Sequence, residues 1–137
     1  QVRDFLPELH RHYAEAALQA GDLTTAMAEA QQALTLAQEL EMRGEEGDAL
    51  CVLGQICTAR KDYEAAATYL QKSLAIRTES GDIYEGARTQ LALAHLYHRQ
   101  GDKAQAWAFL EHCTPVFERL GAALDLTDAR ALERELA

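Results

Sequence analysis

The chain has 137 residues, of which 48% are hydrophobic and 26% charged, and its formal net charge at pH 7 is −9. This length fits one domain, and the negative charge excludes nucleic acid, whose binding needs a basic stripe to replace condensed counterions, and anionic membrane surfaces. The apolar stretches are far shorter than the roughly 20 residues that span a bilayer, and three cysteines without a close pair favour a reducing, cytoplasmic location.

Helical periodicity runs along the whole chain, and no stretch alternates with the period of two that marks a strand. Helix-forming residues dominate the composition. Helices are therefore predicted at about 4–20, 23–42, 46–60, 63–79, 83–100, 103–119 and 123–136. The chain begins with Gln1 rather than Met, which we interpret as the mark of a piece of a longer protein.

Residues typical of turns and helix ends lie between the predicted helices. Glycines are predicted just past helix ends, where a left-handed backbone is needed, at Gly21, Gly81, Gly101 and Gly121. Aspartates are predicted as N-caps that accept a bond from an otherwise unpaired amide, at Asp22, Asp62, Asp82 and Asp102. Pro115 lies inside the sixth predicted helix, where its missing amide donor predicts a kink.

Small residues recur forty positions apart along the chain. The first helix of each predicted pair carries Ala14, Gly54 or Ala94, and the second carries Ala26, Ala66 or Ala106. Small side chains at both points let paired helices approach closely, and a period of roughly 20 to 50 residues marks a solenoid. We therefore predict three repeats at about 1–40, 41–80 and 81–120, forming a single domain over 1–137.

The last segment, about 122–136, is predicted to be a capping helix. It has a narrow apolar stripe of leucines and alanine, and a polar remainder that includes Asp125, Asp128 and Glu135. A helix that closes a solenoid needs one face for the array and one for water. Trp107, beside the packing alanine Ala106, is expected to lie in the core between repeats.

These residues resemble the tetratricopeptide repeat, whose motif has a large and then a small residue in its first helix, a Gly-Asp-aromatic turn, and two alanines in its second helix. The middle copy fits best, at Leu50, Leu53, Gly54, Lys61, Asp62, Tyr63, Ala66, Leu70, Ser73 and Leu74. The outer copies match at Tyr13, Ala14, Gly21, Asp22, Ala26, Ala33 and Leu34, and at Leu93, Ala94, Tyr97, Gly101, Asp102, Ala106 and Leu110. The resemblance implies an all-α fold, a right-handed superhelical array of antiparallel helix pairs.

The chain also departs from that family. Its period is 40 rather than about 34 residues, which is similar to the subset found in kinesin light chains and in bacterial multidomain signalling regulators. Cys57 and Ala17 replace the usual aromatic residue of the first helix, and His10 and Gln90 replace its opening large residue. The resemblance to the regulators favours a segment of a larger signalling or regulatory protein.

In the family that the chain resembles, the first helix of each pair lines the concave face. Carried over to this chain, the candidate partner-binding residues are Arg11, His12, Glu15, Gln55, Arg88, His95, His98 and Arg99. The wider set adds Glu8, Gln19, Asp48, Cys51, Val52, Thr58 and Leu91. The lysine and asparagine clamp of chaperone-binding relatives is absent, which excludes chaperone tails.

The third copy is basic on this face. Arg88, His95 and Arg99 are spaced to share one side of a helix, where an acidic peptide or a terminal carboxylate could dock, because arginine makes paired bonds to carboxylates. The alternative is a solvated polar face that binds nothing. Two histidines on one helix do not supply the three or four ligands that zinc needs, so no metal or other cofactor is expected.

The sequence has no nucleophile with a base, no Gly-rich phosphate loop and no serine elbow, so we expect no enzyme. We expect an adaptor that binds a protein or peptide in its concave groove. The alternative function is a structural spacer or self-association segment, which would pair through the apolar residues Val2, Phe5 and Leu6.

Overall fold

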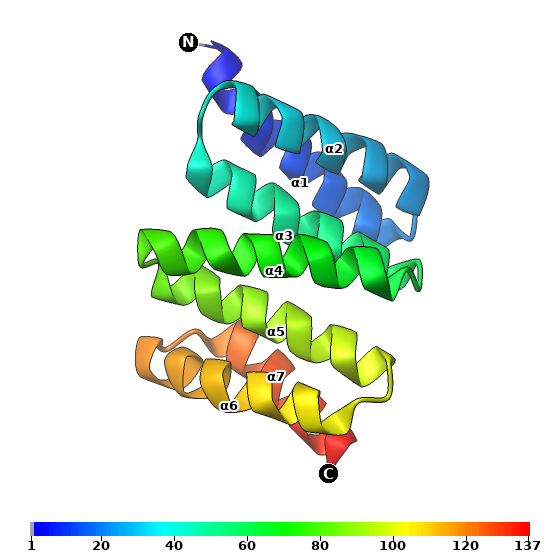
Figure 1. Ribbon diagram of the computed structural model, residues 1–137, viewed down its shortest axis with the longest axis vertical. Coiled ribbons are helices and arrows are strands. Elements are labelled where there is room, and N and C mark those ends of the chain that lie inside the picture. The colour runs from blue at the N-terminus through cyan, green and yellow to red at the C-terminus, as the bar shows by residue number, and fades with distance from the viewer. Residues whose placement is uncertain (1) are drawn as a thin grey trace. The chain divides into compact units, whose positions relative to one another are not determined.

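The structure, a computed structural model, describes residues 2–137, and every regular element in that range is a helix (Figure 1). A 3₁₀ turn, Val2–Phe5, comes first. The α-helices are α1 (Leu6–Ala20), α2 (Leu23–Glu39), α3 (Arg43–Ala59), α4 (Tyr63–Ser80), α5 (Ile83–Arg99), α6 (Lys103–Leu120) and α7 (Ala123–Leu136). The all-α class and the order of the helices are confirmed, and Gln1 lies outside the described residues.

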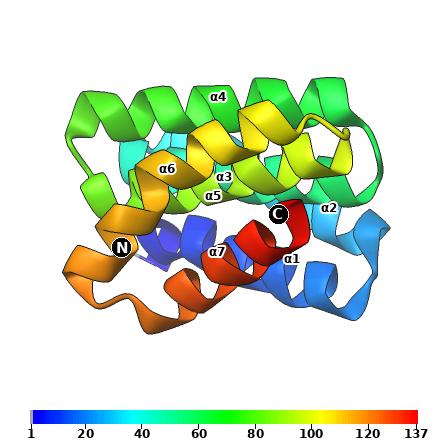
Figure 2. The ribbon, with the colours of Figure 1, turned by 90° about the horizontal axis from the view of Figure 1, so that it is seen from below.

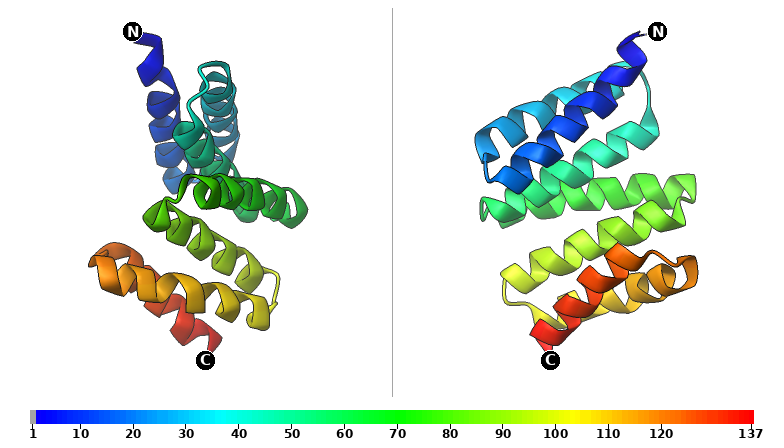
Figure 3. Two further views of the ribbon diagram at one scale, coloured as in Figure 1. Left: turned by 60° about the vertical axis from the view of Figure 1, so that its left-hand side comes forward. Right: turned by 180° about the vertical axis from the view of Figure 1, so that it is seen from behind.

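The chain divides into two compact units, Gln1–Ile76 and Arg77–Ala137. In the first unit α1 packs on α2, α2 packs on α3, and α1 also contacts α3. In the second unit α5 packs on α6, α6 on α7, and α7 also contacts α5. Figure 2 shows α6 and α7 joined by a short turn, and Figure 3 shows α1 and α2 as an antiparallel pair. Helices that follow one another in the chain pack against each other, as they do in a helical repeat. The single domain and the right-handed sense of its superhelix stay predictions.

Each unit has its own core. The core of the first unit joins three helices and consists of Ala14, Ala26, Ala30, Val52, Leu53 and Ile56. The core of the second unit consists of Ala87, Leu91, Ala94, Ala106, Leu110, Cys113, Phe117, Ala129, Leu132 and Leu136. Trp107, expected in the core between repeats, is only partly buried and packs against this second core. The recurring small residues are all buried, which confirms their role in close packing.

The predicted caps are present at the helix N-termini. In each case an aspartate carboxylate accepts a bond from the amide three residues on: Asp22 from Thr25 (3.1 Å), Asp62 from Ala65 (3.3 Å), Asp82 from Glu85 (3.0 Å) and Asp102 from Gln105 (3.1 Å). The hydrogen bond from Thr25 is the main reason that the pKa of Asp22 is lowered.

The predicted boundary between the second and third helices is wrong by about three residues. Instead of ending at 42 and restarting at 46, α2 ends at Glu39 and α3 begins at Arg43. The reason is Glu41, whose φ of 55° places it in the left-handed region and turns the chain there. Helix α6 continues through Pro115, and the kink predicted at this proline stays a prediction.

Candidate functional site

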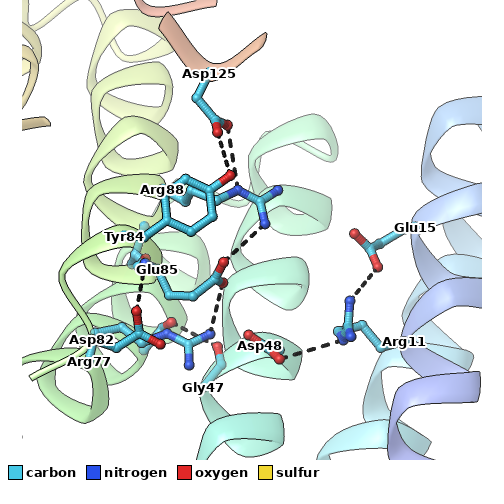
Figure 4. A network of polar contacts seen from close by, with 12 residues as sticks. Arg11, Glu15, Gly47, Asp48, Arg77, Asp82, Tyr84, Glu85, Arg88 and Asp125 are labelled. Atoms are coloured by element: carbon cyan, nitrogen blue, oxygen red, sulfur yellow. Dashed lines mark hydrogen bonds and ion pairs between the residues drawn. The ribbon is translucent and has the colours of Figure 1, made fainter. Parts of the chain in front are cut away.

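Arg11 of α1 lies among three carboxylates of the first unit, of which Figure 4 shows those of Glu15 and Asp48. Its Nη1 is 2.9 Å from Glu15 Oε1, and its Nε is 3.5 Å from Glu45 Oε2 and 3.8 Å from Asp48 Oδ2. Burial lowers the pKa of the guanidinium, but the charges of Asp48, Glu15 and Glu45 raise it by more. Arg11 therefore carries its charge within a bridge from α1 to α3.

The remaining predicted residues of the first two repeats differ in exposure. His12 is exposed, with ring nitrogens 3.5 Å from Glu8 and 3.7 Å from Glu15, and Gln55 is exposed. Three members of the wider set are buried and cannot offer a side chain to a partner, which corrects the expectation for them: Val52, Thr58 and Leu91. Their positions on the helices face the core.

The basic side chains of α5 lie next to carboxylates of α7. This contact between the two helices was not predicted from the sequence. The pairs are Arg88 Nε with Asp125 Oδ1 at 3.5 Å, His95 Nε2 with Asp128 Oδ1 at 2.9 Å, and His98 Nε2 with Glu135 Oε2 at 3.0 Å. The three acidic residues were expected to face water as the polar side of a capping helix. We call the three basic side chains Arg88, His95 and His98 the α5 cation row, in which the two histidines carry a charge only when they are protonated.

The first pair of this row belongs to a larger polar cluster at the start of α5 (Figure 4). The Tyr84 hydroxyl donates to Asp125 at 2.6 Å, and this bond is the largest cause of the raised pKa of Tyr84. The Arg88 guanidinium lies 5.9 Å from the centroid of the Tyr84 ring, a cation–π distance. Arg88 also donates to Glu85 at 3.3 Å, so the cluster fixes the first turn of α7 against α5.

Burial lowers the pKa of Arg88, but Glu85 and Asp125 raise it by more. Arg88 is therefore positively charged and lies next to two carboxylates, those of Glu85 and Asp125. Arg99, at the last turn of α5, is exposed, and no ion pair joins it to another residue in the described range. The structure therefore brings Arg88, His95 and His98 together in one row, with Arg99 beyond the end of that row.

The three cysteines differ in burial. Cys51 is half-buried, while Cys57 and Cys113 are buried. Burial is the largest cause of the raised pKa of the Cys57 thiol, and it raises the pKa of Cys113 to about 12. Because the thiolate is the reactive form, these two thiols act at neutral pH as small apolar side chains.

Within residues 2–137, no group of three or more His, Cys, Asp or Glu side chains is arranged to hold a metal ion. None of the helices that the structure describes is both long enough and apolar enough to cross a membrane.

Two overlapping segments match a sequence profile of the tetratricopeptide repeat, residues 6–79 and residues 48–119. Together the matches extend from the start of α1 almost to the end of α6, and thus include every residue of the α5 cation row. A comparison with curated proteins gave no match.

Proposed function

Because the chain belongs to the tetratricopeptide repeat family, we propose that it is an adaptor segment that holds a peptide of a partner protein against the first helices of its repeats. Repeats of this family are in general protein–protein interaction modules without catalytic chemistry. More specifically, we propose that the peptide binds in a groove formed by those helices. We also propose that the chain is part of a cytoplasmic signalling or regulatory protein.

An acidic peptide is the ligand that we propose for the third repeat. The α5 cation row supports this proposal, because its three side chains lie 2.9–3.5 Å from carboxylate oxygens of α7. These distances are those of charge-assisted hydrogen bonds and close ion pairs. An external carboxylate would bind in the same way, either sharing a cation with α7 or replacing the α7 carboxylate.

The exposure of the row also supports the proposal. Arg88 and His95 keep a large part of their side chains in contact with water, and Arg99 is exposed. The α7 carboxylates neutralise part of the positive charge, so we propose a modest affinity that weakens as salt screens the charges.

The proposal is tested by titrating the protein with three fluorescently labelled decapeptides, one acidic, one neutral and one basic. We expect saturable binding of the acidic peptide alone. In the variant Arg88→Ala/His95→Ala/Arg99→Ala its dissociation constant rises at least tenfold, because each lost charge-assisted bond contributes about 1.5–3 kcal/mol before screening.

A control variant, Arg60→Ala/Lys72→Ala, removes two exposed cations outside α5 and so matches the loss of the two arginines. We expect this control to bind the acidic peptide as the unmodified protein does. Equal binding of all three peptides, or equal loss in both variants, would show that the attraction is general and would exclude Arg88, His95 and Arg99 as the binding surface.

A further inference from the structure

Helix α1, together with Phe5 just before it, has large apolar side chains on a side that faces water. Phe5 is 69% exposed, Leu9 43% and Tyr13 53%. The three are spaced four residues apart, so they lie along one side of the helix, and the exposed Ala16 extends the same side. We call Phe5, Leu9, Tyr13 and Ala16 the α1 stripe. Scattered exposed apolar residues are ordinary on a protein surface, but a continuous row of them marks an interaction site.

Because the chain repeats every forty residues, α3 and α5 show whether the corresponding side of the helix is buried in the later repeats. The corresponding positions in α3 and α5 are Ala49 and Thr89 for Leu9, Leu53 and Leu93 for Tyr13, and Ile56 and Leu96 for Ala16. All six of these side chains are at most 1% exposed. At three of its four positions the α1 stripe therefore corresponds to side chains that are buried in the two later repeats, while Glu45 and Glu85, the counterparts of Phe5, are half-buried.

In the first unit, the helix that covers this side is known. Leu53 and Ile56 of α3 lie in one core cluster with Ala26 and Ala30 of α2. The alanines of α2 let the larger side chains of α3 approach its backbone closely. The second helix of one repeat thus covers the first helix of the next, and α1 has no such helix over its stripe within the described range.

The C-terminal end of the chain is built differently. Ala129, Leu132 and Leu136 of α7 are buried against the second core, and beyond the first turn the exposed residues of α7 are polar, among them Arg130 and Arg134. This is the two-faced composition of a helix that ends a repeat array in water. Helix α1 differs, because its exposed residues include the large apolar side chains of the α1 stripe as well as polar ones such as Glu8 and His12.

We propose that the α1 stripe is the docking surface for an α-helix of a partner that carries a row of alanines, as α2 does, and that continues the packing of α2 on α3. A second copy of this chain does not offer such a helix, because its own α2 alanines are buried, namely Ala26, Ala30, Ala33 and Ala37. A symmetric pairing of two α1 stripes would place large side chains against large side chains and hold the helix backbones apart. The proposal does not depend on the acidic peptide, because the stripe and the α5 cation row belong to different helices.

The probe is a synthetic peptide of residues 23–40, the segment that covers α3. Isolated helices of this length are marginal in water, so a lactam bridge joins positions 28 and 32 after Ala28→Lys and Gln32→Glu, both exposed in the fold. Titration into the ¹⁵N-labelled full chain is expected to give saturable NMR shifts centred on residues 5–16. A control peptide with Ala26→Glu and Ala30→Glu is expected to give none.

In the variant Leu9→Glu/Tyr13→Glu the dissociation constant of the peptide is expected to rise at least tenfold, with unchanged circular dichroism and unchanged binding of the acidic decapeptide. The single variant Tyr13→Gln, expected to weaken binding several-fold, provides the same test if the double variant loses its helicity. Three results would each overturn the proposal: no shifts in α1, shifts centred instead on α2 and α3, or shifts that appear without peptide as the protein concentration rises. The last of these would identify a second copy as the occupant.

Discussion

At the scale of single residues, the close packing of α3 depends on a position where the residue has no side chain. Gly54 of α3 is buried, and a Cβ atom built on it would overlap Cγ of Leu70 in α4, which is itself fully buried. Gly44, one residue into the same helix, has open space where its Cβ would lie. Gly54 and Gly44 of α3 therefore differ, because packing requires a glycine at position 54 and does not require one at position 44.

We expect Gly54→Ala to lower the free energy of unfolding by about 1–3 kcal/mol, since the overpacking exceeds the roughly 0.5–1 kcal/mol that alanine gains over glycine within a helix. Gly44→Ala, the matched control, should leave stability unchanged or raise it by up to about 1 kcal/mol. Urea unfolding of both variants measures the difference as a shift of the midpoint at constant slope. A Gly54→Ala protein as stable as the unmodified chain would contradict the close approach of α3 and α4.

At the scale of elements, a left-handed residue ends each helix that a further helix follows in the described range, from α1 to α6. These residues recur every twenty positions, at Gly21, Glu41, Lys61, Gly81, Gly101 and Gly121, with φ between 55° and 82°. The helices and four of these turns could be predicted from glycine, aspartate and periodicity. The turn at Lys61 could also be predicted, because Lys61 and Asp62 align with Gly21 and Asp22 of the first repeat. Glu41 could not be recognised from its side chain, and this is why the end of α2 and the start of α3 were misplaced. Only the spacing of the other turns contained a signal for it.

Lys61 and Gly101 occupy equivalent turns, which gives a reciprocal pair of substitutions. Lys61→Gly should raise the free energy of unfolding by about 0.5–1 kcal/mol, because a side chain in the left-handed region costs about 1–2 kcal/mol and glycine returns part of that through its freer unfolded state. Gly101→Lys should destabilise by a similar amount. Thermal unfolding followed by circular dichroism compares the two, and changes of the same sign would be inconsistent with a backbone origin.

At the scale of the whole molecule, the candidate site could be only partly predicted from the sequence. The positions of Arg88 and His95 on one side of α5 follow from helical spacing, and their basic character is visible in the sequence. Their pairing with Asp125 and Asp128 depends on α7 lying along α5, which no local pattern reveals, because an acidic residue on a capping helix has the same sequence signature whether it faces water or a cation. The basic side chains that we propose as the binding surface for a partner therefore also contact α7.

The most direct test of this account is the dissociation constant of the acidic decapeptide for the variant Asp128→Asn/Glu135→Gln. These substitutions keep the size of both side chains but remove the two charges that lie nearest to His95 and His98. If α7 competes with the ligand for the α5 cation row, the variant binds the acidic peptide at least several-fold more tightly than the unmodified protein, and the gain shrinks as salt is added. Unchanged or weaker binding, with the helical content intact, would contradict the assignment of this row as a surface for an acidic partner.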